Sequence, residues 1–346
     1  MKKVLLGVFA ATFLFSCSNS DDNTIDNGGT EESFKYGYLV VNEGGYGHNN
    51  ASVSYISPTM SRIHSNIFSA KNNGELLGDV AQSITFDGDV AYIVMNNSNM
   101  IRIVDRYTFK QIGEITEEMT LPRYAAVANG KLYVTNSGDV MEKGDEFITV
   151  YDLENNSFIK RIDVDIVAEE IFANDNYLYV GSDPWTIEHK IGIFDLSSDE
   201  LVNTITLENK ITGMLKNSGD GIYVLESSSE KSAISKIDGT TLVKNITTTA
   251  ARDAQFLALD NGYLYTVANG NQVFKINATM PNFPSNPSFN IGISDNLYGF
   301  NIINGNVFVA DTNFLAGTSS VLVYNLQGDF VKWFQGGVGT SKFYKN

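Results

Sequence analysis

The sequence predicts an all-β protein, a seven-bladed β-propeller. A short strand of the Leu-Tyr-Val type recurs seven times, and its anchor residues are Leu39, Tyr92, Tyr133, Tyr179, Tyr223, Tyr265 and Phe308. Neighbouring anchors are 53, 41, 46, 44, 42 and 43 residues apart. A repeat of this length that contains only strands is typical of a propeller, because one four-stranded blade cannot bury its faces without its neighbours.

The strand after each anchor strand closes, in six of the seven units, with a carboxylate or an amide. These residues are Asp105, Asp152, Asp195, Asp238, Asn277 and Asn325, and the first unit has Ser57 instead. Short polar side chains of this kind accept hydrogen bonds from the backbone two residues further on. We therefore expect them to cap the turn into the outermost strand of each blade.

Tight turns lead into six of the anchor strands: Asp87-Gly88-Asp89, Asn129-Gly130, Asp175-Asn176, Gly219-Asp220-Gly221, Asn261-Gly262 and Asn304-Gly305. Asn-Gly predicts a type I′ hairpin, because both central residues of that turn need positive φ. The first unit lacks this turn and also an innermost strand. We expect the tail, Ser341 to Lys345, to supply that strand and close the ring, which leaves no blade edge unpaired.

The composition favours one large domain of strands, from residue 34 to residue 346. The chain has 17 Tyr and 21 Phe against only 6 Pro, and aromatic residues favour strands. No segment shows sustained helical periodicity, so helix should be scarce.

The amino terminus predicts export. Lys2 and Lys3 precede an apolar run from Val4 to Phe15, and Leu14-Phe15-Ser16-Cys17 resembles the lipobox of bacterial lipoproteins. A run this short is a secretory signal and too short for a membrane span. We expect residues 1–16 to be a signal peptide and Cys17, the only cysteine, to be lipidated, so that acyl chains alone hold the protein to the membrane.

Residues 17–33 are expected to form a disordered tether, because they are polar and contain a single Ile. Asp21 and Asp22 resemble the acidic export stretch of surface lipoproteins in some Gram-negative lineages, and a plain solvated linker is the alternative. Both interpretations fit a lipid anchor in the outer membrane. The net charge of −16 excludes binding of nucleic acid or of anionic lipid headgroups through bulk charge.

Catalytic motifs are absent from the sequence, and we expect neither enzyme activity nor a cofactor. His48, His64 and His189 stand in no metal-ligand spacing, and no nucleophile elbow or zinc-hydrolase helix occurs. The acidic loop from Asp139 to Glu146 and the cluster Asp163, Asp165, Glu169 and Glu170 lack the ligand spacing of a calcium loop. We interpret both as solvated faces and predict no metal site.

The loops that leave the anchor strands are the best candidates for function, because in a propeller they emerge on one face around the central channel. Their first residues form a polar ring: Asn42, Asn96, Asn136, Ser182, Glu226, Asn269 and Asp311. The predicted ligand-binding residues are Tyr46, His48, Asn49, Trp185 and Phe314 in these loops, with Met141 beside them, and Arg123, Arg252 and Tyr298 in the connections between blades.

Aromatic planes among amide and guanidinium donors on a concave face suit a large polar ligand that also has apolar surfaces. The alternative is structural: the ring residues cap strand ends, and the aromatic residues pack loops against one another.

The segment from Val41 to Ser54, together with the lipobox, the sevenfold repeat and the closing Ser341-Lys342-Phe343-Tyr344, resembles the YncE-like seven-bladed propeller lipoproteins of the Gram-negative cell surface. The resemblance spans the chain from Cys17 onward. Among these relatives, the BtuG proteins capture cobalamin and pass it to a TonB-dependent outer-membrane transporter. The resemblance implies such a ligand and such a partner here.

Two classes of function therefore follow from the sequence. The first is a surface lipoprotein that binds a large solute, corrinoid-like in chemistry, beside a transporter. The second is an adhesive or scaffold propeller that binds protein or glycan through a broad face. A propeller enzyme is a third class, and Asp311, Glu226 and His48 would be its only candidates for a base or metal ligand.

Overall fold

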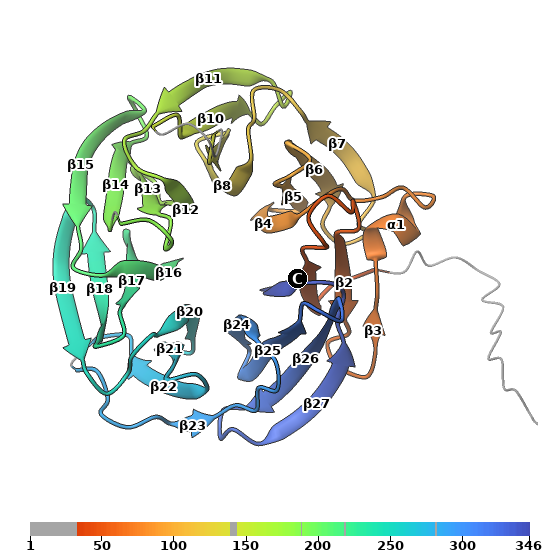
Figure 1. Ribbon diagram of the computed structural model, residues 1–346. Helices are drawn as coiled ribbons and strands as arrows, with labels where there is room; N and C mark the ends of the chain where they lie inside the picture. Colours follow the sequence, from red (N-terminus) through yellow and green to blue (C-terminus); the bar gives the residue numbers. More distant parts are fainter. Residues whose placement is uncertain (1–32, 139–143, 188, 218, 281) are drawn as a thin grey trace, which may run out of the picture. The chain divides into compact units, whose positions relative to one another are not determined.

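The computed structural model describes residues 33–138, 144–187, 189–217, 219–280 and 282–346. Residues 33–346 form one compact unit of seven four-stranded sheets arranged as blades around a central axis (Figure 1). Each blade runs antiparallel from an innermost to an outermost strand. The predicted all-β seven-bladed propeller is confirmed.

Each blade consists of four strands, named in order from the innermost to the outermost. Blade 1 has β28 (Thr340–Lys345), β1 (Tyr38–Asn42), β2 (Ser52–Ile56) and β3 (Ile63–His64); blade 2 has β4 (Ala81–Asp87), β5 (Val90–Met95), β6 (Met100–Asp105) and β7 (Gln111–Ile115); blade 3 has β8 (Pro122–Ala128), β9 (Lys131–Asn136), β10 (Phe147–Asp152) and β11 (Phe158–Asp163); blade 4 has β12 (Ala168–Ala173), β13 (Tyr177–Ser182), β14 (Lys190–Asp195) and β15 (Glu200–Thr206). Blade 5 has β16 (Lys210–Lys216), β17 (Gly221–Ser227), β18 (Ser232–Asp238) and β19 (Thr241–Thr248); blade 6 has β20 (Gln255–Asp260), β21 (Tyr263–Ala268), β22 (Gln272–Asn277) and β23 (Phe289–Asn290); blade 7 has β24 (Leu297–Ile303), β25 (Asn306–Asn313), β26 (Thr318–Asn325) and β27 (Phe330–Gln335).

The tail closes the ring as the sequence predicts. Strand β28 pairs antiparallel with β1, with Tyr38 opposite Lys345 and Val40 opposite Phe343. The tail also reaches blade 2, where the backbone N–H of Ile84 donates a hydrogen bond to Tyr344 Oη at 3.1 Å. The first blade is therefore assembled from both ends of the propeller.

The longest spacing in the repeat, between blades 1 and 2, contains the one helix of the described residues, α1 (Ile67–Lys71). Its Ile67 and Phe68 are buried against the two blades. No helix of the described part of the chain is long and apolar enough to cross a membrane.

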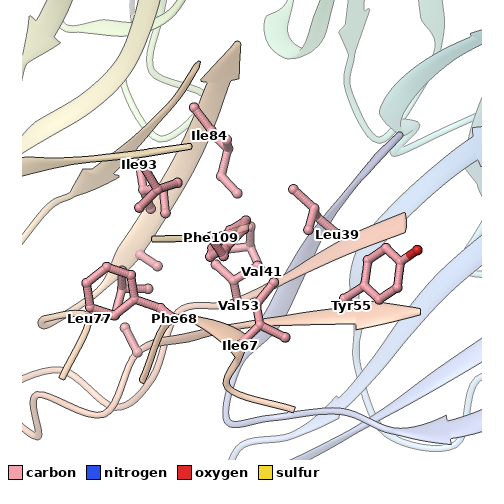
Figure 2. Close-up of a cluster of buried hydrophobic side chains, with 14 of the residues drawn as sticks. Leu39, Val41, Val53, Tyr55, Ile67, Phe68, Leu77, Ile84, Ile93 and Phe109 are labelled. Atoms are coloured by element: carbon pink, nitrogen blue, oxygen red, sulfur yellow. The ribbon is translucent and has the colours of Figure 1, made fainter. Parts of the chain in front are cut away.

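Seven hydrophobic clusters hold the ring together, one at each interface between neighbouring blades. Figure 2 shows the cluster between blades 1 and 2, where Leu39, Val41 and Val53 face Ile84 and Ile93. The core of this protein is thus a series of interfaces, which explains how more than 300 residues form one domain.

Three of the anchor tyrosines, Tyr133, Tyr179 and Tyr223, connect neighbouring blades through their hydroxyl groups. Tyr133 donates to Asp199 Oδ1 at 2.7 Å, and Tyr223 donates to the carbonyl oxygen of Ala278 at 2.9 Å. In each case the acceptor lies in the next blade, at the turn that follows its third strand. At these positions Tyr therefore has a structural role: the ring packs in the interface and the hydroxyl reaches across it.

The three Asn-Gly turns are confirmed, and the prediction of capping residues holds with one exception. Asn129-Gly130, Asn261-Gly262 and Asn304-Gly305 all have positive φ at both residues, as type I′ turns require. The capping role is confirmed at five positions, where a side-chain oxygen accepts from the backbone two residues on: Asp105, Asp152, Asp195, Asn277 and Asn325. The prediction is wrong for Asp238, whose carboxylate accepts from Asn217 and Lys236 instead, because Gly239 makes the turn with a φ of 54°.

Candidate functional site

Every innermost strand contains a β-bulge close to its first residue, where one extra residue interrupts the pairing with the second strand. The residues at these bulges are Gln82, Arg123 and Tyr124, Glu169 and Glu170, Thr212, Phe256 and Leu257, Tyr298, and Ser341. A bulge re-aims side chains and is common next to functional sites. These residues form a ring of bulges at the mouth of the channel.

The bulges correct the placement of two predicted residues. Arg123 and Tyr298 do not lie in the connections between blades, because each is the second residue of an innermost strand, β8 and β24. A bulge there is invisible to a strict alternation of apolar and polar residues, so the sequence placed the start of both strands too late. At Gly299, beside Tyr298, a Cβ would lie 2.4 Å from the carbonyl oxygen of Ser341, so the bulge of blade 7 packs directly on β28.

Arg123 and Glu169 form a two-point ion pair between blades 3 and 4. Arg123 Nε and Nη2 each donate to one Glu169 oxygen at 2.6 Å, and Nη1 donates to Gln82 Oε1 at 3.1 Å. Burial raises the pKa of Glu169 in spite of this partner. Burial alone would lower the pKa of Arg123, but the Glu169 carboxylate raises it. The guanidinium is therefore a fixed cation that links three blades.

Two residues of the ring of bulges, Glu170 and Tyr124, lie near Lys342, which directly follows the bulge of β28, so that side chains of three blades meet. The Lys342 ammonium lies 5.2 Å from the centre of the Tyr124 ring, which joins blade 1 to blade 3 across the channel. Glu170 Oε2 accepts from the backbone N–H of Met214 at 2.7 Å. Burial raises the pKa of Glu170 from its ordinary 4.5 to about 7. The Lys342 ammonium opposes this shift, and the Glu169 carboxylate adds to it.

The raised pKa of Glu170 predicts a stability that falls as pH rises. Between about pH 4.5 and pH 7 the folded protein holds a proton that the unfolded chain has released, so the free energy of unfolding decreases across this window. We expect Glu170→Gln to be about 1–3 kcal/mol more stable than the parent at pH 8 and nearly equal to it at pH 4.5. Urea unfolding at both values measures this, with the exposed Glu154→Gln as control. A Glu170→Gln stability difference that does not depend on pH would contradict the assignment.

A cavity of about 460 Å³ opens beside the ring of bulges, over blades 7, 1 and 2. Its wall includes four of the predicted ligand-binding residues, namely Tyr46, Arg123, Tyr298 and Phe314, together with Gln82 and Asn313. The volume lies in the usual range for a small-molecule site. The structure therefore brings half of the predicted set together in one place.

Aromatic rings form one side of this cavity. Tyr298 and Phe314 meet edge to face, with centroids 4.8 Å apart and planes at 89°. Tyr298 Oη donates to Glu43 Oε2 at 2.7 Å, and burial together with this carboxylate raises the pKa of Tyr298. Tyr46 is 73% exposed and Phe314 is 54% exposed, so both rings present free surface to a ligand. The cavity thus combines aromatic planes with the donors of Arg123 and the acceptor Glu43.

The other four predicted residues lie outside the cavity wall. Trp185 is 88% exposed in the β13–β14 loop of blade 4, with the Lys210 ammonium 5.7 Å from its ring. Arg252 is exposed in the connection between blades 5 and 6. His48 and Asn49 are exposed beyond Tyr46 in the first loop. Trp185 and Arg252 share the loop face with the cavity, but they belong to blades on the other side of the ring (Figure 1).

The side chains of the polar ring mainly form hydrogen bonds with backbone groups. Five of its members accept hydrogen bonds from N–H groups of the connection into their own blade: Asn42 from Gly337, Asn136 from Thr120, Glu226 from Glu208 and Asn209, Asn269 from Arg252, and Asp311 from Ser294 and Asp295. Asn96 donates to the carbonyl oxygen of Pro122, and Ser182 Oγ accepts from the N–H of Lys190. Of the seven, Asn96 also lines the cavity. Strand-end capping, the structural alternative, is therefore a role that these side chains have.

Sequence reasoning missed Glu43, Gln82 and Lys342, and it interpreted Glu169 and Glu170 as a solvated face. That interpretation is wrong for Glu169, which is buried and paired with Arg123, and for Glu170, whose carboxylate accepts from the Met214 N–H and whose pKa is raised by burial. The available signal was the pair of adjacent polar residues at the start of an innermost strand, as in Glu169-Glu170, which breaks the alternation and marks a bulge.

Among the described residues no group of three or more His, Cys, Asp and Glu side chains could hold a metal ion. Two of the three candidates for an enzyme are committed to backbone contacts, because Glu226 and Asp311 each accept from two N–H groups. Cys17, residues 1–16, most of the tether and Met141 lie outside the described residues.

Comparison with known proteins identifies one matching family and several solved structures of similar fold. The family described as "Domain of unknown function (DUF5074)" matches residues 36–330. A quinoprotein alcohol dehydrogenase-like protein from Bacteroides thetaiotaomicron is 15% identical, with a TM-score of 0.72 over 90% of this chain and 79% of that one. A functionally unknown protein from Desulfotomaculum acetoxidans is 12% identical, with a TM-score of 0.67 over 90% and 99%. At this identity both show the propeller fold alone. The search of curated proteins found no match.

Proposed function

The chain belongs to the DUF5074 family, whose description names no activity, and we propose that it is a binding protein without enzyme activity that holds a polar solute at the mouth of its channel. The observation that supports this proposal most strongly is the cavity over blades 7, 1 and 2. There, exposed aromatic rings stand beside a guanidinium that Glu169 and Gln82 keep in one orientation. A preorganised donor beside aromatic planes recognises a ligand that has both acceptors and a flat apolar surface.

The proposed ligand is corrinoid-like, and the proposed setting is the outer surface of the outer membrane, where Cys17 would carry the lipid anchor. A cavity of about 460 Å³ is too small to enclose a whole corrinoid, so it would receive one edge of the ligand. The rest would lie over the loop face and stay accessible. An accessible ligand suits transfer to a partner, and a TonB-dependent transporter is the partner that we propose.

A second candidate, a propeller that binds a protein or a glycan, is favoured by a separate observation. Two apolar residues of the β13–β14 loop, close together in sequence, are almost fully exposed: Trp185 at 88% and Ile187 at 97%. Exposed apolar groups on one face are typical of protein contact sites. The two functions are compatible if this surface contacts the transporter.

Two matched substitutions separate these functions. We expect Tyr46→Ala to weaken solute binding about tenfold to a hundredfold, because the exposed ring supplies stacking area and does not support the fold. Trp185→Ala, equally exposed but outside the cavity, should leave solute binding unchanged and weaken a protein partner instead. Calorimetric titration of residues 33–346 with cobalamin, haem and siderophores measures the first effect. No binding by any solute would leave the adhesive or scaffold function as the better account.

A further inference from the structure

A second cavity, of about 500 Å³, lies on the face opposite the loops. It is lined by Lys35, Tyr36, Arg106, Tyr107, Lys345 and Asn346. It sits where β1 begins and β28 ends, whereas the first cavity lies near the other ends of these strands. The two cavities are therefore separate sites on opposite faces of the ring.

The lining of this second cavity is strongly basic in an acidic protein. Lys35, Arg106 and Lys345 contribute three cations, and no Asp or Glu side chain belongs to the wall, although the chain has 40 acidic against 24 basic residues. Even with a carboxylate at Asn346 the wall would keep a positive charge. Asp105, the neighbour of Arg106 in sequence, turns its carboxylate to its own Asx turn, where Oδ1 accepts from the Thr108 N–H at 2.8 Å. Burial opposes the effect, but this hydrogen bond and, less strongly, the Lys35 ammonium lower the pKa of Asp105.

In the described part of the chain, the direct contacts of these cations are with neutral groups. Arg106 donates to neutral acceptors, Asn346 Oδ1 and the Lys345 carbonyl oxygen, both at 3.0 Å. Lys345 donates to Asn304 Oδ1 at 3.1 Å, and the Lys35 ammonium lies 4.6 Å from the centre of the Tyr107 ring. Within the described part of the chain, none of the three forms an ion pair. Arg106 is thus held in place while its charge remains available to an anion.

Tyr36 contributes an exposed aromatic ring to the same cavity. Its backbone is in the left-handed region with a φ of 64°, and its side chain is 78% exposed. The turn before β1 imposes this conformation on Tyr36 and leaves its ring in solvent. An exposed Tyr among Lys and Arg side chains is also the composition found at the interface between membrane and water.

We propose that this basic cavity binds a phosphate group, and that the group belongs to an anionic membrane lipid or to a soluble phosphate ester. Two residues of the cavity, Lys35 and Tyr36, follow shortly after Ser33, the first residue of the propeller unit, in the sequence. If Cys17 is lipidated, the sixteen residues that lead from it to residue 33 span at most about 55 Å, so the cavity can reach the headgroups of the same membrane. The proposal goes beyond the solute site and does not depend on it.

The test uses residues 33–346, which contain every strand of the ring together with the strand that closes it. Co-sedimentation compares vesicles of phosphatidylcholine with vesicles that also contain phosphatidylglycerol. We expect binding to the anionic vesicles alone, with a steep loss at high salt. The variant Lys35→Gln/Lys345→Gln should bind about 30-fold more weakly, because each lysine near an anionic surface contributes to partition independently. Lys210→Gln/Lys332→Gln removes the same charge elsewhere and should retain most of the binding.

A parallel titration with glycerol 3-phosphate and inorganic phosphate identifies the source of the phosphate group. Binding to anionic vesicles without binding of the free esters would assign the site to the lipid surface. Binding of a free ester that the Lys35→Gln/Lys345→Gln variant loses would assign it to a soluble ligand. The proposal fails if neither probe binds, or if the control variant loses as much binding as the cavity variant.

Discussion

Deletion of residues 340–346 is expected to unfold the entire ring, because it removes the innermost strand of blade 1. Strand β28 pairs with β1 along its length and packs against β24 of blade 7, so its loss opens one blade interface and exposes the edge of β1. In a ring whose blades depend on their neighbours, the damage should spread beyond blade 1. Thermal unfolding monitored by circular dichroism measures it, and a variant that melts within about one degree of the parent would refute closure by the tail.

A point substitution tests the same closure without truncation. Phe343 is 2% exposed and packs on Phe308 of blade 7, with ring centroids 5.5 Å apart. We expect Phe343→Ala to cost about 3–5 kcal/mol of unfolding free energy. Phe330→Ala is the matched control, because Phe330 is 58% exposed on the outermost strand of blade 7 and should cost much less.

Arg123→Met is expected to cost about 3–5 kcal/mol at pH 8, since it leaves the Glu169 carboxylate buried without its cation. The cost should shrink toward pH 5, because the raised pKa of Glu169 lets it take up a proton there. Urea unfolding of residues 33–346 at both pH values measures the effect.

Two further variants keep this prediction specific. Arg123→Met/Glu169→Gln should recover much of the lost stability, because it removes both charges together. Lys231→Met breaks an exposed ion pair with Glu208 and should cost no more than about 1 kcal/mol. Equal costs for Arg123→Met and Lys231→Met would show that the Arg123 pair is not an important link between blades.

The sequence was a good guide to the fold, because every blade repeats the same local signals. The Leu-Tyr-Val strands, the Asn-Gly turns and the capping Asp or Asn all follow from short-range chemistry, and together they located the second and third strands of every blade. Even the closing strand could be predicted, since blade 1 lacked a partner for Leu39 and its neighbours.

The site was harder to predict because its geometry depends on the bulges and on the order of the blades. In each of two blades, a one-residue bulge directs the side chain of Arg123 or Tyr298 into the wall of the cavity. The alternation of apolar and polar residues does not reveal this bulge. The blade order could have separated Trp185, in blade 4, from Tyr46, in blade 1, because those blades lie on different sides of a seven-membered ring. The partners of Glu169 and Lys342 come from other blades, so no local pattern contains them.

The most direct test of the proposed binding site is a crystal structure of residues 33–346 with the solute that binds most tightly in the titrations. The account predicts that the solute lies over blades 7, 1 and 2, with a flat surface against Tyr46 or Phe314 and an acceptor facing Arg123. A solute seated instead over Trp185 and Arg252, with the cavity beside Tyr298 empty, would contradict it.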